Sequence, residues 1–365
     1  MKLKNKKIMK ALNYKTILLC WLVIFSSTNN LFSEEGEIFS KTVKQEFLVN
    51  EQTLLDINNK FGKIDFIDWE KNSVNLEVLI IVKDLKKEKA DAILNKISIK
   101  IEELESLIKI ETIIEESRNK NKSGEQNFEI NYTVSLPRYL KLKVQNKFGD
   151  IFINEHNGKS NFDVQFGDFR ANKLMFDDSK PMSTISASYG NVSIGTCTWA
   201  KFLTSFGDLS IDECKAIISL SSYSDVKIKN VSSLICDSKF DSYKIGTVNN
   251  LVLNAGYVDI EVQKIINKLE LDMEFGDFEV KEISPEFKEI KIINEYGTID
   301  LELNENISYN LDATVEYCEI EFDGGNNLNI VKNGEGKKIS GKFGPDINTT
   351  AKITIDSKFG EIELN

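Results

Sequence analysis

The chain has 365 residues, 41% of them hydrophobic, so it is long enough to bury a large core. Its formal net charge is −11, and it has a single histidine, His156, which argues against most acid–base and metal chemistry. The negative charge also disfavours anionic partners, so nucleic acid and anionic lipid surfaces are excluded as expected ligands.

Residues 1–33 are typical of a secretory signal peptide. They carry six lysines and no acidic residue, and an apolar run covers residues 17–25 before the polar residues 26–30. That run is too short to span a bilayer, which needs about 20 apolar residues, so an uncleaved anchor is the disfavoured alternative. Cleavage near Ser33, with Ser26 or Ser27 as alternatives, leaves 40 basic and 57 acidic residues, a net charge of −17. No later segment is long and apolar enough to be transmembrane.

Residues 34–137 are expected to form a first coil with an α/β cap inserted after it. The phrase Phe61-Gly62 is flanked by alternating apolar residues, and the next such glycine comes only at Gly149. Between them the pattern predicts a strand at 74–82, an amphipathic helix at 85–94, one or two strands at 97–114, a charged turn at 115–127 and a strand at 128–136. Such a cap would protect the end of a stack of repeats from edge-to-edge aggregation.

Residues 138–365 repeat one phrase, an aromatic residue followed by glycine and an acidic residue, mostly every 17 to 21 residues. Repetition at such a period is typical of solenoids, whose units bury their apolar faces only by stacking on each other. The copies are Phe148-Gly149-Asp150, Phe166-Gly167-Asp168, Tyr189-Gly190-Asn191, Phe206-Gly207-Asp208, Tyr223-Ser224-Asp225, Phe275-Gly276-Asp277, Tyr296-Gly297-Thr298 and Phe359-Gly360-Glu361, with weaker copies at Phe240, Ala255, Tyr317 and Phe343.

When positions are counted from each aromatic as zero, apolar residues occupy even positions before it and odd positions after it. A straight strand would bury one set and expose the other, so the chain must turn at the glycine, and the acidic residue after it can close the corner through local backbone groups. Each coil is then a strand, a corner, a second strand and a variable loop such as 154–159 or 283–287. The predicted fold is mainly β, a single-stranded parallel β-solenoid with a small α/β N-terminal cap, a bulge or loop around Pro345, and an uncapped far end.

Four cysteines remain after export, which makes disulfides permissible. Cys197 and Cys214 each lie eight residues after their corner aromatic, so they would be neighbours on successive coils. A disulfide and a simple stack of two small apolar residues are equally compatible with this spacing, because coils about 4.8 Å apart are at the short end of the disulfide range. Cys236 falls at a core position and is expected to pack there.

The run Tyr132-Thr133-Val134-Ser135-Leu136-Pro137, the run from Leu140 to Ile151 and the Gly-Asp repeats resemble the putative-adhesin family of bacterial envelope proteins. These are domains of unknown function with a β-solenoid fold. The resemblance covers about residues 40 to 365 and rests on structural, repeat-level motifs. It implies adhesion by analogy and supplies no catalytic residues to carry over.

The acidic residues that follow the corner glycines would form a broken column of carboxylates along the rod: Asp150, Asp168, Asp208, Asp225, Asp277, Glu319 and Glu361. Calcium suits such oxygen ligands, but the phrase lacks the Gly-Gly-x-Gly-x-Asp spacing of calcium-binding β-rolls. A turn-closing role is therefore favoured, and no metal or cofactor is expected.

A glycan-processing enzyme on the same fold would need two converging carboxylates, and no spacing singles out a pair. Trp69, Trp199 and Tyr309 could stack on sugars, although packing over the core is favoured because aromatic side chains carry a large apolar area. His156 falls in the predicted loop 154–159 and is expected to be exposed, with no Cys or His nearby. No catalytic residue is therefore assigned.

We expect an exported, non-enzymatic, adhesin-like interaction protein of the cell envelope, in the periplasm, on the cell surface or secreted. Its partner would be an envelope protein or a glycan, bound through the long repetitive faces of a rod. The alternatives are a glycan-processing enzyme on a β-solenoid and a periplasmic scaffold or regulator of an envelope-stress system.

Overall fold

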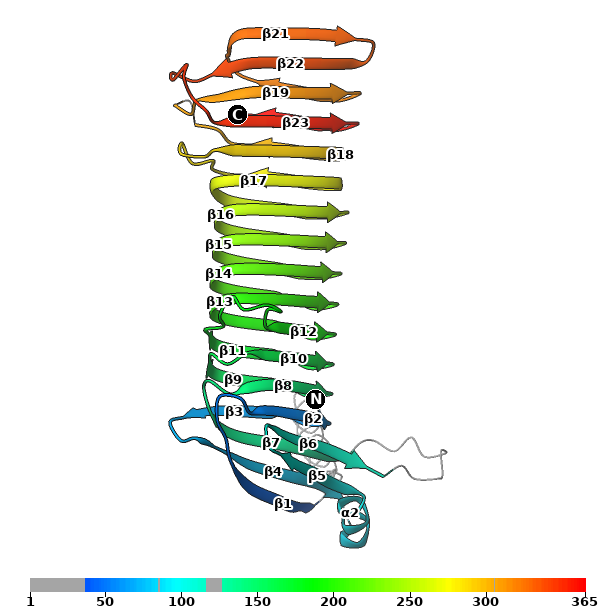
Figure 1. Cartoon of the computed structure of the whole chain (residues 1–365). Coiled ribbons are helices and arrows are strands. Elements are labelled where there is room, and N and C mark those ends of the chain that lie inside the picture. The colour runs from blue at the N-terminus through cyan, green and yellow to red at the C-terminus, as the bar shows by residue number, and fades with distance from the viewer. Residues whose placement is uncertain (1–36, 85, 116–126, 305) are drawn as a thin grey trace, which may run out of the picture.

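The computed structural model describes residues 37–84, 86–115, 127–304 and 306–365. The predicted signal peptide and most of the predicted charged turn lie outside these ranges. The described residues form one 24-stranded, mostly parallel sheet and one helix, α2 (Lys87–Leu94), so the protein is mainly β. That helix has neither the length nor the apolar character to cross a membrane. Figure 1 shows the strands stacked along one direction, with the N-terminal region at one end.

The central strands pair in parallel with the equivalent strand of the next repeat (Figure 1). Phe162, for example, lies in register between Val144 and Ile185, and all three are buried. Because equivalent positions stack, their apolar side chains form columns that run through one continuous core. The strands of this part are β8 (Lys141–Lys147), β9 (Ile151–His156), β10 (Ser160–Gln165), β11 (Phe169–Leu174), β12 (Thr184–Ser188), β13 (Val192–Ser205), β14 (Leu209–Ser222), β15 (Asp225–Lys239), β16 (Ser242–Gly256), β17 (Asp259–Val280) and β18 (Glu289–Leu301).

The middle repeats contain no loop. Strands β13 to β16 each run unbroken for 14 or 15 residues, and they bend where two successive side chains point outward, as at Asp212 and Glu213. The predicted unit of two strands and a loop is therefore wrong for these repeats. Loops of the predicted kind occur at 157–159, 175–183 and 281–288.

Each corner has a left-handed backbone at the aromatic residue and not, as predicted, at the glycine. Of the corner glycines, only Gly62 and Gly276 have positive φ. Glycine is needed at most corners for close approach, because a Cβ on Gly207 would lie 2.1 Å from the carbonyl oxygen of Gly190. Twelve aromatics have φ between 49° and 66°: Phe61, Phe148, Phe166, Tyr189, Phe206, Tyr223, Phe240, Tyr257, Phe275, Tyr296, Tyr317 and Phe359.

Two of the predicted weaker copies are wrong. The left-handed residue that lies between Phe240 and Phe275 is Tyr257, whereas Ala255 is buried in β16. Phe343 forms no corner: it is buried and its ring packs parallel to that of Tyr309. A loop follows at 344–351, as predicted around Pro345.

The far end of the stack is capped, contrary to the prediction. The last strands, β23 (Lys352–Lys358) and β24 (Glu361–Leu364), insert between β18 and the earlier strands β19 (Tyr309–Glu316) and β20 (Glu319–Phe322). An antiparallel hairpin of β21 (Asn326–Asn333) and β22 (Gly336–Phe343) then pairs with β19. Spatial order therefore differs from chain order here, and the hairpin closes the stack (Figure 1).

The strands and the helix predicted for the N-terminal cap are present. Strands β2 (Leu54–Lys60) and β3 (Ile64–Trp69) flank the corner at Phe61 and pair with β8 and β9 on one side. On their other side lie β6 (Leu107–Ile114) and β7 (Phe128–Pro137). Antiparallel strands β4 (Ser73–Asp84), β1 (Glu37–Leu48) and β5 (Ile97–Leu104), together with α2, complete this end.

Cys197 and Cys214 face each other on β13 and β14, and their sulfur atoms are bonded, with Cα atoms 4.5 Å apart. Of the two alternatives that the spacing left open, the structure has the disulfide. Cys236 and Cys318 are free and buried, so Cys236 packs in the core as predicted. The disulfide ties two successive repeats together.

Replacing Gly207 by alanine should destabilise the protein by about 2 kcal/mol or more, because the added methyl group would meet the Gly190 carbonyl. Gly256→Ala is the matched control, since its Cβ would have no neighbour closer than 4.0 Å. That variant should be neutral or more stable by up to about 1 kcal/mol. Urea unfolding followed by circular dichroism measures both, and equal effects would contradict the role of close approach.

Protein purified after export should contain two thiols that react with an alkylating agent in denaturant without reductant, namely Cys236 and Cys318. Reduction should expose Cys197 and Cys214 as well. The disulfide joins residues 17 positions apart, and closing a loop of that length contributes about 3 kcal/mol, so the double variant Cys197→Ser/Cys214→Ser should lose about that much stability. Four reactive thiols before reduction would rule the bond out.

Candidate functional site, an exposed aromatic ladder

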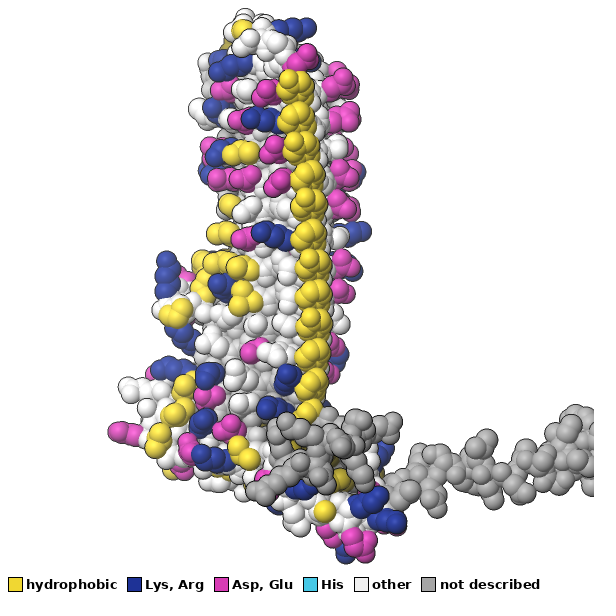
Figure 2. Space-filling view, turned by 90° about the vertical axis from the view of Figure 1, so that its right-hand side faces the viewer, with side chains coloured by type: hydrophobic (Ala, Val, Ile, Leu, Met, Phe, Trp, Pro, Cys, Tyr) yellow, Lys and Arg dark blue, Asp and Glu magenta, His cyan; other side chains and the backbone are white. Residues whose placement is uncertain are grey.

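The twelve corner aromatics stack into one column, here called the aromatic ladder. Neighbouring ring centroids are 4.6–5.2 Å apart and neighbouring ring planes differ by 2–15°. Figure 2 shows the ladder as a straight yellow column along the stack. In spatial order its rings are Phe61, Phe148, Phe166, Tyr189, Phe206, Tyr223, Phe240, Tyr257, Phe275, Tyr296, Phe359 and Tyr317.

The ladder is a large exposed apolar surface. All of its rings except Phe61 and Phe275 are 41–56% exposed. With about 200 Å² of surface on each ring, roughly half exposed, the ladder presents on the order of 1,000 Å². The largest contiguous apolar patch on a monomeric soluble protein is usually a few hundred Å², and larger patches mark binding surfaces. This size makes the ladder the candidate functional site.

The rings present their edges and not their faces. Each interior ring has a neighbouring ring against both faces, so a sugar or another aromatic group cannot stack on it. Lys147 illustrates the point: its Nζ is 5.2 Å from the centroid of Phe148 and 5.8 Å from that of Phe166, while these two centroids are 5.0 Å apart. The ammonium group therefore lies beside the stack, along the ring edges, and the ladder offers lateral contact only.

Tyrosine hydroxyls recur along the ladder at every second ring. From Phe166 to Tyr317 the spatial order alternates strictly between phenylalanine and tyrosine. Two spacings of 4.9 Å separate Tyr189 from Tyr223, so hydroxyls are about 10 Å apart. Among the described residues no ladder hydroxyl makes a hydrogen bond, which leaves each free to bond a partner or water.

A column of carboxylates runs beside the ladder and appears in Figure 2 as magenta groups along its right-hand side. The corner at Tyr257 adds Asp259, which was not among the predicted members. The column consists of the residues two positions after the aromatics: Asp150, Asp168, Asp208, Asp225, Asp259, Asp277, Glu361 and Glu319. Arg170 relieves the repulsion at one end, since it bonds Asp168 at 2.6 Å and lies 4.0 Å from Asp150.

The prediction that these carboxylates close their own corners is wrong for Asp150 and Asp168. Asp150 accepts a 2.9 Å hydrogen bond from the backbone N–H of Asp168, and Asp168 accepts the equivalent bond from Asn191. These two carboxylates therefore link one repeat to the next, and Asp259 does the same by accepting from the backbone N–H of Asp277 at 3.3 Å. Three of the corners are closed from within by a buried amide two positions before the aromatic. Asn59 donates to the Gly62 carbonyl at 3.3 Å, Asn146 to that of Gly149 at 2.9 Å and Asn294 to that of Gly297 at 2.8 Å.

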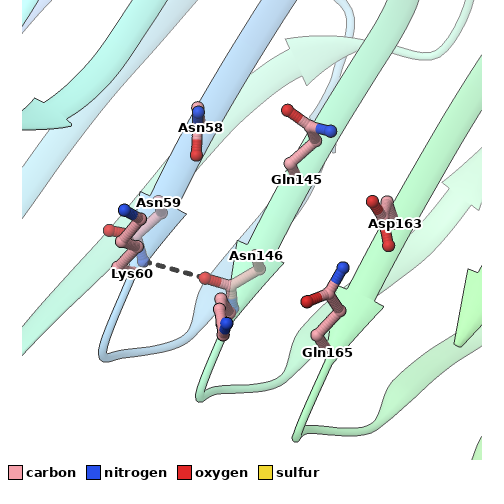
Figure 3. Close-up of a pocket in the computed structure, with 8 residues that line it drawn as sticks. Asn58, Asn59, Lys60, Gln145, Asn146, Asp163 and Gln165 are labelled. Atoms are coloured by element: carbon pink, nitrogen blue, oxygen red, sulfur yellow. Dashed lines mark hydrogen bonds between the residues drawn. The ribbon is translucent and has the colours of Figure 1, made fainter. Parts of the chain in front are cut away.

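A hollow of about 140 Å³ lies near the N-terminal end of the ladder, on the side away from the carboxylate column. Figure 3 shows that Asn58, Gln145, Asp163 and Gln165 line it from three adjacent strands. The amide of Asn59 donates to Asn146 at 3.1 Å, so these two buried side chains bond each other. The remaining amides make this hollow a polar site suited to hydroxyl-rich groups.

The three aromatics singled out from the sequence are not a sugar platform. Tyr309 is buried, in line with the favoured packing role, because its ring packs on that of Phe343 in the terminal hairpin. Trp69 is half-buried and donates from its indole nitrogen to the Ser73 carbonyl at 2.7 Å. Trp199 is half-buried with the Lys215 Nζ 5.1 Å from its ring centroid. The most exposed aromatics are instead the corner residues.

No site with several metal-ligating side chains forms in the part of the chain that the structure describes: no three His, Cys, Asp or Glu residues gather there. The acidic residues are spread over the surface in ion pairs such as Lys143 with Asp56 and Lys268 with Glu289. The arrangement offers repeated shallow contacts and not a single convergent centre.

His156 was expected to be exposed in a loop, and that expectation is wrong. It is the last residue of β9, is 1% exposed and packs edge-on to Phe176. Neither ring nitrogen has a hydrogen-bond partner among the described residues. Burial lowers the pKa of His156 to about 4, so the ring is neutral at pH 7.

This buried histidine should make stability fall in mild acid. In the unfolded chain His156 has the ordinary pKa of about 6.5, so from pH 6.5 down to pH 4 the unfolded state takes up a proton that the folded state does not. The resulting loss is about 3 kcal/mol, present in full below pH 4 and absent above pH 6.5. In His156→Leu it should vanish. Unfolding free energies of both proteins, measured from pH 8 to pH 4, test this, since other groups cancel in the difference; a constant difference would contradict it.

No protein-family model matches the chain. No curated protein matches it either. Three solved structures that match are a putative cell adhesion protein from Clostridium sporogenes (12% identity, 89% of this chain and 99% of that one, TM-score 0.21), a putative adhesin from Parabacteroides merdae (11%, 71% and 95%, 0.35) and a putative adhesin from Bacteroides fragilis (12%, 89% and 97%, 0.26). These TM-scores are low, and no property of the three proteins is transferred to this chain.

Proposed function

We propose that the chain is an exported, non-enzymatic, adhesin-like protein of the cell envelope. In this proposal its stacked repeats are a single-stranded parallel β-solenoid that binds an envelope protein or glycan along its length. The observation that carries the proposal is the aromatic ladder, an exposed apolar surface that runs through twelve repeats. The parallel register between successive repeats and the recurrence of the same corner support the solenoid.

The ladder favours a protein partner over a glycan. Sugars usually bind aromatic side chains through the ring faces, and these faces are covered by neighbouring rings. Ring edges and regularly spaced hydroxyls suit instead a surface of apolar and hydrogen-bonding side chains. The carboxylate column beside the ladder would add attraction for basic groups on that partner.

Binding would be distributed over many equivalent contacts. Each rung offers the same ring edge at the same spacing, and stacking holds the rings in place, so little side-chain entropy is lost on binding. Many weak, repeated contacts on one rod give avidity without a deep pocket. A glycan is the second candidate, and the amide-lined hollow at the N-terminal end is the observation that favours it.

Protein purified after export should co-sediment saturably with at least one of the isolated cell-wall, outer-membrane or glycan fractions. Replacing Tyr189, Tyr223, Tyr257 and Tyr296 by phenylalanine keeps the stack and removes four exposed hydroxyls, so binding should weaken at least about tenfold. The melting temperature should stay unchanged, which separates lost contacts from lost folding.

Tyr139→Phe is the matched control, because its hydroxyl bonds Asn72 away from the ladder. It should leave co-sedimentation unchanged. Release of soluble glycan fragments without saturable binding would overturn the proposal and favour an enzyme. Binding that survives all four ladder substitutions unaltered would move the contact surface elsewhere on the rod.

A further inference from the structure

On one flank of the ladder, three successive levels have smaller side chains than the other levels. The residue just before each aromatic points outward beside the ring edges, and at most levels it is long or charged, as at Lys147, Lys239 and Glu274. At three successive levels it is a partly exposed serine: Ser188, Ser205 and Ser222 pair in register on β12, β13 and β14. We call these three residues the serine strip. Tyr189, Phe206 and Tyr223 are 47–53% exposed, and on this side each is preceded by a short serine side chain.

The serine strip has an apolar wall opposite the ladder. Leu203 and Leu220 lie two residues before Ser205 and Ser222, pair in register and are partly exposed. Ile218 and Ile235 continue this wall, and Ile235 is 47% exposed. Figure 2 shows pale surface beside the middle of the ladder, with charged groups above and below. The strip therefore has two apolar sides and a floor of small hydroxyl side chains.

The strip has defined ends. In the register of the sheet, Ser222 is followed by Lys239 and Leu220 by Asp237. At the other end Ser188 is preceded by Gln165, and Ser186 by Asp163. Beyond Gln165 lies Lys147, whose side chain already occupies this flank beside Phe148 and Phe166. A long side chain at the position before the aromatic thus fills the space that the serines leave open.

The spacing along the strip selects the shape of a ligand. Tyr189, Phe206 and Tyr223 repeat every 4.9 Å along the stack. An extended peptide lying along this direction repeats its side chains every 6.6–6.8 Å, by its rise of about 3.3–3.4 Å per residue, and falls out of register with the rungs. A flat, rod-shaped aromatic molecule has no protruding groups to match and gains the same apolar contact at each rung.

The charge around the strip selects a cation. Asp208 and Asp225 stand on the other side of the ladder at the same levels, and the exported chain carries a net charge of −17. In the register of β13 to β15 the basic residues on this face are Lys201, two residues before Leu203, and Lys239, which has Asp237 beside it on the same face. The rings and leucines supply apolar contact, and the field of the carboxylates sets the preferred sign of charge.

We propose that the serine strip, between the ladder edges of Tyr189 to Tyr223 and the wall of Leu203 and Leu220, is a binding site for flat, elongated aromatic cations. Such a site does not depend on the macromolecular partner proposed above. Its occupant lies parallel to the stack and spans several repeats at once. The site exists only in the folded stack, because its members come from three different strands.

The test uses thioflavin T, a flat aromatic cation, with protein purified after export, and measures fluorescence and equilibrium binding. One saturable site per chain is expected, with affinity that falls as salt is added. Ser205→Lys should weaken binding at least about tenfold, because the new side chain would fill the strip. Lys147 occupies the same flank in this way beside Phe148 and Phe166. Ser193→Lys is the matched control: it lies on the same strand β13, is exposed on another face and adds the same charge, so binding should change less than about twofold.

A second pair of variants should improve binding. Lys239→Ser lengthens the strip by one level and should tighten binding about threefold or more, whereas Lys227→Ser, which removes the same charge from another face of the same strand β15, should change it less than about twofold. Absence of saturable binding would overturn the proposal. Equal losses in Ser205→Lys and Ser193→Lys would do the same, as would tighter binding of the anionic dye Congo red. Failure here leaves the co-sedimentation result untouched.

Discussion

The left-handed backbone at each corner aromatic is the constraint on which the rest of the structure depends. For a bulky residue this conformation costs about 1 kcal/mol or more, whereas glycine adopts it freely. Stacking between aromatic rings is worth about 0.5–1.5 kcal/mol per pair beyond burial, and each corner in the ladder adds one such pair. The ladder therefore offsets the strain that its own residues create. A corner is stable only beside another corner, so the unit of stability is the stack and not the single repeat.

Satisfying backbone polar groups at a corner takes different residues at different levels. Where glycine occupies the position after the aromatic, backbones approach closely, and at three of these corners a buried amide, such as that of Asn146, caps the glycine carbonyl. Ser224 takes the place of glycine after Tyr223, and there the buried carboxylate of Asp241 accepts hydrogen bonds from its N–H and from the hydroxyls of Ser221 and Ser238. At this corner the hydrogen bonds to a buried carboxylate take the place of the close approach between glycine backbones. The repeat can therefore lose its glycine and keep the corner.

The strands, the N-terminal helix and the spacing of the repeats could be predicted from the sequence, because period-two patterns and the recurring phrase record local and nearest-neighbour constraints. The insertion of β23 between β18 and β19 could not, since it is a choice among similar strands that no local pattern distinguishes. The exposure of the ladder was missed because large aromatics are usually buried. The signal was present in the change of apolar parity at each aromatic: four residues in succession, such as 205–208, separate one buried position from the next. His156 was predicted in a loop because the residues before it, Asn154 and Glu155, are polar. In the structure they are the bend of β9, and His156 after them points into the core.

The order of the rings supports the proposal that a partner binds along the ladder. Along the chain Tyr296 is followed by Tyr317 and then by Phe359, which would bring two tyrosines together. In space Phe359 lies between them, so the alternation of phenylalanine and tyrosine continues to the end of the ladder. The exposed hydroxyls contribute little to stability because water satisfies them when no partner does. Their regular spacing fits the proposed partner, which would lie along the ladder and meet one hydroxyl at every second ring.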